Sequence, residues 1–405
     1  MLDAVRYDFP FFQAHPDLVY FDNAATTQKP ASVIEAERFF YENGNANVHR
    51  GGAYLIANEA TTSYEAVREQ VRGLLNAASI REIIFTSGTT EGINIVAQSF
   101  AHDALAEDDA ILISAMEHHA NLIPWQQICR RKKARLLVAP VSKQGVLDLD
   151  IFEKMLAREA GRVKIVAITH ISNTLGTINP IVQITALAHR YGAVILVDAA
   201  QSIVTHPIDT QALDVDFLVF SGHKMFGPTG TGVLYGKEKC LEKMLPVQFG
   251  GGMIRDVSFE TTRFAPLPHK FEAGTPNIAG VIGLGAAIDW LQKTGSTHIR
   301  QHIQALLAYA TKQLDAIPGL QIIGQAPEKS GILSILLDDI HPHDLATFLD
   351  ARGICVRAGH HCTQPLMDFL EIPGTVRVSF SIYNTLEEID RLAEALKAAR
   401  VFFGK

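Results

Sequence analysis

The chain has 405 residues, of which 47% are hydrophobic and 20% are charged, which is typical of a globular protein long enough for two to three domains. Its net charge of −7 argues against nucleic acid as a main partner, and no apolar run approaches the roughly 18 residues that span a membrane. The N-terminus lacks the pattern of a signal peptide, and four cysteines without a Cys-x-x-Cys pair predict a cytoplasmic protein without disulfides.

Short apolar runs alternate with helical patterns through much of the chain. Strands are predicted over residues 82–86, 110–114, 164–169, 193–198, 217–221 and 232–235. Helices are predicted over residues 61–76, 91–106, 121–130 and 180–191. Strands that alternate with helices of this length predict an α/β fold with a mainly parallel sheet covered on both faces.

The pattern changes near Trp290, after which a smaller α+β domain is predicted. Its helices are predicted over residues 299–317, 343–352 and 387–403, and its strands over residues 332–337, 354–357 and 375–381. We therefore expect a large domain of residues 21–290 and a small domain formed by residues 1–20 and 291–405.

Polar clusters follow five of the predicted strands of the large domain. In a doubly wound sheet, ligands bind outside the carboxyl ends of the strands, so these clusters are expected to meet in one crevice. They are residues 87–90, residues 117–119, His170 with Asn173, Asp198, and residues 221–224.

The first cluster reads Thr86-Ser-Gly-Thr-Thr-Glu-Gly, a strand end followed by a turn and a helix start. Free amides at a helix N-terminus bind anions, and the hydroxyls of Thr89 and Thr90 add donors. A plain helix cap by either threonine explains the pattern equally well. The string is neither a P-loop nor a Gly-x-Gly-x-x-Gly fingerprint, so nucleotide binding is not indicated.

Asp198 and Lys224 lie at the ends of two later strands. A buried Asp198 needs a partner, which a protonated pyridine nitrogen would supply; capping of the next helix or metal binding are the alternatives. Lys224 is flanked by Phe220, Met225 and Phe226, and desolvation there would make its amine nucleophilic towards carbonyls. A lysine that extends to the surface is the alternative, which the flanking Gly-His and Gly-Pro pairs disfavour.

These motifs resemble those of the class V, fold-type I pyridoxal-phosphate enzymes, and among them the SufS/CsdA-like cysteine desulfurases. The similarity runs from Asp22-Asn-Ala-Ala to the C-terminal helix. The most specific strings are Asn47-Val-His-Arg50, Glu117-His-His-Ala-Asn-Leu-Ile-Pro-Trp125, Ser221-Gly-His-Lys224, Phe271-Glu-Ala-Gly-Thr-Pro276 and Arg357-Ala-Gly-His-His-Cys362. The resemblance implies a mainly parallel, seven-stranded type of sheet in the large domain and a catalytic cysteine loop in the small one.

The resemblance also implies roles for individual residues around pyridoxal 5′-phosphate. Lys224 would hold the cofactor as a Schiff base, His118 would stack on its ring, and Asp198 would pair with the ring nitrogen. Gln201 would reach the phenolic oxygen of the ring. The phosphate would be held by Thr89, Thr90, Ser221 and His223, and by Thr275 from the second subunit of a homodimer. The substrate would be bound by Asn173, Arg377, Arg357, His360 and His49.

Cys362 is the residue that would select the reaction, because many enzymes share this cofactor. Its neighbours in sequence, Arg357, His360 and His361, are cations or potential cations that favour a thiolate. Cys355 instead fits a small core residue. Adjacent side chains rarely converge on one ion, so no metal site is expected at His360 and Cys362.

The predicted reaction converts L-cysteine to L-alanine and leaves the sulfur as a persulfide on Cys362. Lys224 would move the α-proton, with His118 placed for proton transfer. The resemblance implies delivery of the sulfur to a SufE-like acceptor for iron–sulfur cluster assembly. Selenocysteine lyase, another class V activity such as transamination, and a non-catalytic protein that docks sulfur carriers are the alternatives.

Two positions depart from the common pattern of these relatives. Thr363 follows the cysteine where relatives usually have alanine, and residues 51–54 read Gly-Gly-Ala-Tyr. Both lie near the expected site, so they bear on substrate preference and acceptor contacts. The segment 249–268 is long enough for a hairpin that reaches the site of a partner subunit.

Overall fold

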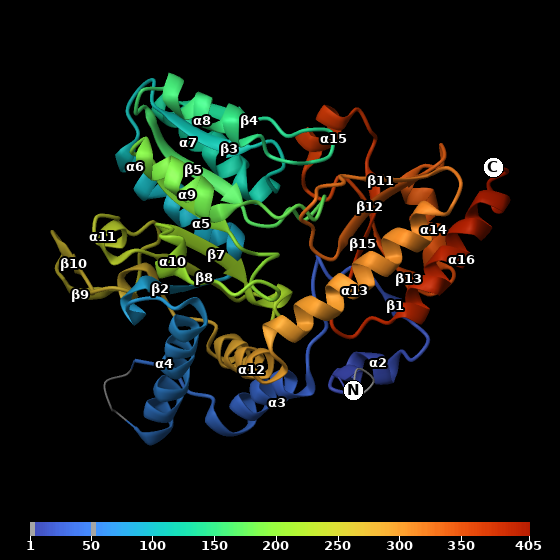
Figure 1. Ribbon diagram of the computed structural model, residues 1–405. Helices are drawn as coiled ribbons and strands as arrows, with labels where there is room; N and C mark the ends of the chain where they lie inside the picture. Colours follow the sequence, from blue (N-terminus) through green and yellow to red (C-terminus); the bar gives the residue numbers. More distant parts are fainter. Residues whose placement is uncertain (1–4, 50–53) are drawn as a thin grey trace.

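A seven-stranded sheet forms the centre of the computed structural model, which describes residues 5–49 and 54–405 (Figure 1). The strand order is β2-β8-β7-β6-β5-β3-β4; the pairs from β7 to β4 are parallel, and β8 runs antiparallel to both neighbours. This confirms the predicted α/β fold. The strands are β2 (Ile83–Thr86), β3 (Ala110–Ser114), β4 (Arg135–Ala139), β5 (Val163–Thr169), β6 (Val194–Asp198), β7 (Phe217–Ser221) and β8 (Gly232–Gly236).

Helices cover both faces of this sheet because alternate strand residues point to opposite sides. Leu112 and Val166 lie in one apolar core, and Ile111 and Ile165 lie in another. The first core includes residues of α4 (Leu55–Leu75), α8 (Leu149–Arg158), α9 (Ile181–Arg190) and α12 (Ile278–Thr294). The second includes residues of α5 (Thr89–Gln98), α6 (Phe100–Ala104) and α7 (Ile123–Lys132).

A second, antiparallel sheet lies in the C-terminal part of the chain, with the order β11-β12-β15-β14. Its strands are β11 (Leu320–Ile323), β12 (Ile332–Leu337), β14 (Arg357–Gly359) and β15 (Thr375–Ser379). Its helices are α13 (Ser296–Asp315), α14 (Pro342–Asp350), α15 (Gln364–Leu370) and α16 (Leu386–Phe402). The division of the chain into domains near residue 290 stays a prediction; α12 runs through that point to Thr294.

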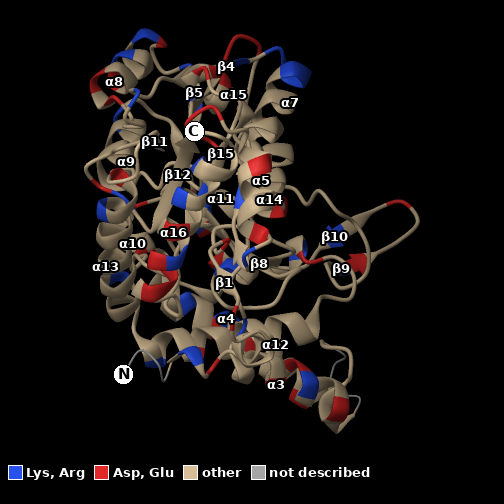
Figure 2. Ribbon diagram, turned by 90° about the vertical axis from the view of Figure 1, so that its right-hand side faces the viewer, with Lys and Arg blue, Asp and Glu red and all other residues tan. Residues whose placement is uncertain are grey.

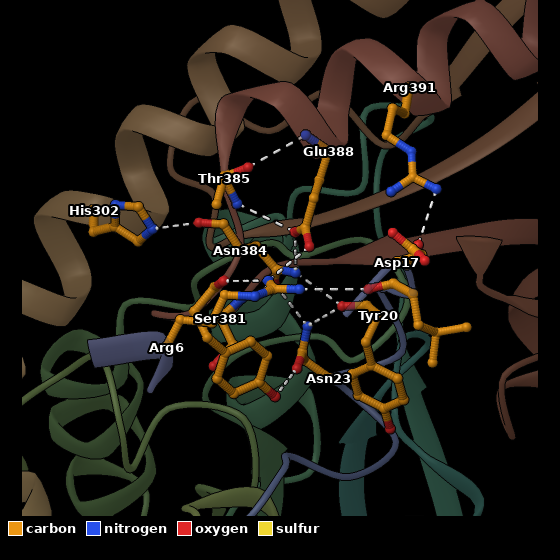
Figure 3. Close-up of polar contacts among 12 residues, drawn as sticks. Arg6, Asp17, Tyr20, Asn23, His302, Ser381, Asn384, Thr385, Glu388 and Arg391 are labelled. Carbon is orange, nitrogen blue, oxygen red and sulfur yellow. Dashed lines mark hydrogen bonds and ion pairs between the residues drawn. The ribbon is translucent and has the colours of Figure 1, made fainter. Parts of the chain in front are cut away.

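The N-terminal segment is fastened to this second sheet and to α16. Strand β1 (Val19–Tyr20) pairs in parallel with β13 (Ile354–Cys355). Figure 3 shows the polar contacts: Arg6 Nη1 binds Glu388 Oε1 at 2.7 Å, and Asn23 Nδ2 donates to Asn384 Oδ1 at 3.1 Å. These contacts fix the segment that leads into Asp22 and Ala24.

Some predicted elements differ from the structure. The helix predicted over residues 91–106 is divided into α5 and α6 at Ser99, whose φ/ψ of −105°/−79° departs from regular helix. The strand predicted over residues 354–357 is divided into β13 and β14. Strand β4 and helix α8 were not predicted; β4 lies at the sheet edge, where its partly exposed residues weaken the apolar pattern.

Charged side chains of both signs are interspersed over the surface (Figure 2). The hairpin of β9 (Ile254–Val257) and β10 (Thr262–Phe264) projects from the body in the same view. Among the helices of the described ranges, none has the length and apolar character that a membrane span requires.

Candidate active site

The polar strand ends converge on a cavity of about 200 Å³ between the two sheets. Eleven of the predicted site residues line it, together with Ala24, Ala25, Ala120, Thr169, Ile171 and Ala200. The eleven are Thr89, Thr90, His118, Asn173, Asp198, Gln201, Ser221, His223, Lys224, Arg357 and Arg377.

Lys224 and Asp198 form the base of this cavity. Asp198 ends β6, where it is 5% exposed, and accepts a hydrogen bond from the Ala200 amide at 2.9 Å. Burial lowers the pKa of Lys224 to about 8, although the Asp198 carboxylate opposes that shift. Burial also raises the pKa of Asp198, with Lys224 acting in the opposite direction. A lysine of this kind is uncharged often enough near neutral pH to attack a carbonyl.

The start of α5 forms one end of the cavity. Gly88, with φ 154°, precedes the helix, and the Thr89 amide donates to Ser221 Oγ at 2.9 Å. A Cβ on Gly232 would lie 2.4 Å from Gly88 Cα, so glycine is required where β8 passes this turn. Thr90 remains exposed, and burial followed by the charge of Lys224 lowers the pKa of His223 to about 4. Hydroxyls and helix amides at one point suit a phosphate group.

His118 lies on the wall of the cavity in a fixed tautomer. Its Nδ1 accepts a hydrogen bond from the Ala120 amide at 3.0 Å, which leaves the proton on Nε2. Burial, and next the charge of Lys224, lowers the pKa of His118 to about 3. The ring is therefore neutral at physiological pH, with its donor nitrogen free of this contact.

Glu117 supports His118 from below and was not among the predicted site residues. Its carboxyl group contacts Ser114 Oγ at 2.5 Å, Asn121 Nδ2 at 2.6 Å and the Thr169 amide at 3.1 Å. Burial raises its pKa to about 8. The position of Glu117 directly after a buried strand was the available sequence signal, although helix capping accounts for that signal equally well.

Arg377, on β15, supplies a buried guanidinium. Its Nη1 donates to the Asn173 carbonyl oxygen at 3.0 Å and its Nη2 to Asp22 Oδ1 at 2.9 Å. Its Nε has no hydrogen-bond partner in the described part of the chain. An unpartnered, buried donor is costly and indicates a place for an anionic ligand. Asp22 was named in the sequence only within a motif, and its contact with Arg377 depends on the tertiary fold.

The cysteine loop, residues 360–364, has an unusual backbone. His361 and Cys362 both adopt the left-handed region, with φ of 53° and 61°. The Cys362 carbonyl oxygen accepts from the His119 amide at 2.7 Å, and Asn173 Nδ2 donates to the His361 carbonyl oxygen at 2.8 Å. These contacts hold the loop against the larger sheet.

The Cys362 thiol is half-buried and lies 3.4 Å from Arg357 Nη2, a residue that lines the cavity. Thr363 is fully buried; its hydroxyl donates to the His360 carbonyl oxygen at 2.9 Å and contacts Thr174 Oγ1 at 2.9 Å. The departure from alanine at this position thus adds a tie between the loop and the larger sheet.

Four predicted site residues do not line the cavity. Cys362 lies beside it through Arg357, and His360 is exposed on the same loop. His49 and Thr275 lie elsewhere, near Asn47, whose Nδ2 donates to Thr275 Oγ1 at 3.2 Å. The motif residues Arg50 and 51–53 fall outside the described residues.

The cavity fits the cofactor that the sequence predicts. A phosphate suits the start of α5, a ring nitrogen suits the buried Asp198 carboxyl, and an aldehyde carbon suits the Lys224 amine. The unpartnered Arg377 Nε lies on the same cavity and suits the carboxylate of an amino acid.

Comparison with known proteins gives a consistent result. The family model described as aminotransferase class-V matches residues 19–392. A cysteine desulfurase of Synechococcus elongatus is 50% identical over 97% of this chain, which spans 63% of that relative's length. A probable cysteine desulfurase of Halalkalibacterium halodurans is 50% identical over 96% of this chain and 94% of its own length. The crystal structure of the Escherichia coli cysteine desulfurase CsdA, in an S-sulfonic acid form, superimposes with a TM-score of 0.92 at 40% identity and covers 99% of both chains.

Proposed function

The chain belongs to the class-V aminotransferase family and is a cysteine desulfurase that uses pyridoxal 5′-phosphate, and we propose that Cys362 is the residue that receives the sulfur. The observation that carries this proposal is the 3.4 Å contact between Cys362 Sγ and Arg357 Nη2 at the edge of the cavity. A guanidinium at this distance favours the thiolate, which is the nucleophilic form of cysteine.

The residues around Lys224 bind and orient the cofactor in this proposal. Thr89, Thr90, Ser221 and His223 hold the phosphate, His118 covers the ring and Gln201 faces the phenolic oxygen. Asp198 keeps the ring nitrogen protonated. When bound, the cofactor supplies an electron sink for the carbon from which a proton has been removed.

Arg377 and Asn173 bind the substrate carboxylate, and Lys224 removes the α-proton of L-cysteine. A lysine whose pKa is about 8 accepts and releases a proton near neutral pH, which suits this task. His118, neutral with its proton on Nε2, donates that proton towards the reacting atoms. His360 and Arg357 attract the thiolate group of the substrate.

Cys362 completes the reaction as a nucleophile. Its thiolate forms an S–S bond with the substrate sulfur while the C–S bond of the substrate breaks and its electron pair stays with carbon. Protonation of that carbon gives L-alanine, and Cys362 retains a persulfide. No external oxidant is required, because the sulfur and the carbon exchange electrons within the substrate.

Cysteine substitution tests this role. A Cys362→Ala variant is expected to keep the visible absorbance of the lysine-bound cofactor and to lose at least about 100-fold in alanine formation from L-cysteine. Cys355→Ala is a matched control in β13, and it should retain activity. Full activity in the Cys362→Ala variant would refute the proposed role.

The partners are also part of the proposal. The exposed Thr275, hydrogen-bonded to Asn47, is available to the cavity of a second subunit, as is His49, which supports a homodimer. The persulfide passes to a SufE-like acceptor in iron–sulfur cluster assembly, and the free cysteines support a cytoplasmic location. Mass spectrometry of the persulfide protein mixed with candidate acceptors identifies the acceptor by the transfer of 32 Da, about the mass of one sulfur atom; a dimer that fails to form would remove the role of Thr275.

A further inference from the structure

Two histidines and a glutamate from three separate segments meet outside the cavity. They are His49, in the loop after η1 (Phe40–Gly44), Glu65 on α4, and His269 at the start of η5 (His269–Phe271). Their ring nitrogen and carboxylate oxygen atoms all lie within 4.8 Å of one another. His49 Nε2 is 2.8 Å from Glu65 Oε1, and the two imidazole rings have centroids 4.9 Å apart.

We propose that His49, Glu65 and His269 form a binding site for Zn²⁺. Two imidazoles and one carboxylate are a ligand set that zinc accepts, with the fourth position left to water. Zinc bonds to nitrogen and oxygen are about 2.0–2.2 Å long, so the ligand atoms need to move inward by only an ångström or so. The His49 side chain is 37% exposed and has room to turn towards the ion.

The surroundings orient the glutamate as metal sites require. Arg68 Nε donates to Glu65 Oε2 at 2.8 Å, which fixes the carboxylate and leaves Oε1 directed at His49. The Arg68 guanidinium is itself paired with Glu272, with contacts of 2.7 and 3.0 Å. That second carboxylate offsets the positive charge that would otherwise repel a cation.

The backbone of His49 is also held in place. Its amide donates to Thr61 Oγ1 at 3.0 Å, and its φ of 56° lies in the left-handed region. A simple ion pair explains the contact between His49 and Glu65 but does not include the His269 ring, which packs edge-on against His49. A shared cation gives all three side chains one partner.

Bound zinc would join the loop at residues 45–49 to the segment at residues 269–275. Asn47 and Thr275, which belong to these two segments, already share a hydrogen bond of 3.2 Å. The inference goes beyond the desulfurase reaction, because none of the sulfur chemistry requires this ion. It adds a clip that orders the region proposed to face a second subunit.

Zinc binding to the cofactor-loaded protein is the test, carried out in a Cys362→Ser background so that the reactive thiol does not bind the metal. Titration with ZnCl₂ against a chromophoric chelator is expected to give one tight site per chain that disappears in His269→Asn. The affinity should fall by more than the roughly 10- to 100-fold that loss of an outer-shell partner costs. His298→Asn, an exposed histidine on α13, is the matched control and should keep the site.

Two results would overturn the proposal. One is an unchanged zinc affinity in His269→Asn, and the other is the absence of any site in the parent. Anomalous diffraction at the zinc edge, from parent crystals equilibrated with ZnCl₂, does not depend on the folding of a variant. A peak between His49, Glu65 and His269 supports the site, and peaks confined to other residues refute it.

Discussion

The base of the cavity and the cysteine loop solve different problems with different structures. Asp198 and Lys224 lie at the ends of central strands, where burial shifts the pKa of both groups. Cys362 lies on a turn of left-handed backbone that follows β14 of the smaller sheet. Five of the hydrogen bonds described above link that turn to itself or to the larger sheet.

The difference shows why one position is enclosed and the other is half-buried. Proton removal from carbon gains from a dry site, because desolvation and a fixed carboxylate tune the lysine and the ring. A thiol that must pass its sulfur to another protein has to reach both the cavity and the surface. The tight turn holds Cys362 at the boundary without enclosing it.

Removal of Lys224 is expected to have the largest effect. Lys224→Ala should lose the visible absorbance of the lysine-bound cofactor and reduce alanine formation by about 10⁴-fold, since general base catalysis is lost together with covalent binding. Absorbance spectra and turnover assays measure both. Lys143→Ala, at an exposed position, serves as the control; a Lys224→Ala variant that is active within tenfold of the parent would contradict the account of the cavity base.

Arg377→Lys separates substrate binding from chemistry. A single ammonium group does not replace the planar fork that contacts Asn173 and Asp22 while a third donor faces the cavity. We expect KM for L-cysteine to rise by about 10- to 100-fold, the cost of one charged hydrogen bond, with a smaller change in kcat. An unchanged KM would remove Arg377 from the substrate site.

The cysteine loop is expected to respond to acid through His361. Burial, together with the charges of Arg377 and Arg357, lowers the pKa of His361 to about 3, against about 6.5 in the unfolded chain. The neutral ring therefore contributes stability that is complete above pH 6.5 and is lost as the pH falls, by about 1.4 kcal/mol per pH unit. Urea midpoints of His361→Asn and the parent should converge between pH 6 and pH 4; parallel curves would contradict the assignment.

Thr363→Ala is expected to have the smallest effect. The change removes two hydrogen bonds of the loop, to His360 and to Thr174, and leaves the base of the cavity intact. Persulfide formation should slow by about 2- to 5-fold, consistent with a net loss of about 1 kcal/mol in positioning, while the cofactor absorbance stays the same. Thr363→Ser keeps the hydroxyl and should restore the rate; equal loss in both variants would show that the hydroxyl is irrelevant.

The sequence predicted the central sheet well because its strands are short, apolar and separated by helical patterns, as for residues 110–114 and 217–221. It predicted that polar strand ends meet because parallel strands end at one edge. It did not predict the Arg377–Asp22 pair, which joins positions 355 residues apart. The cluster of His49, Glu65 and His269 was hidden for the same reason, since its spacing matches no local metal motif.

Mass spectrometry after exposure to L-cysteine tests the central claim most directly. The cofactor-loaded protein is treated with L-cysteine, alkylated and digested, and the peptides that contain Cys129, Cys240, Cys355 and Cys362 are compared. The account predicts one added sulfur on the Cys362 peptide and none on the other three. A persulfide on another cysteine, or alanine release with Cys362 unmodified, would contradict it.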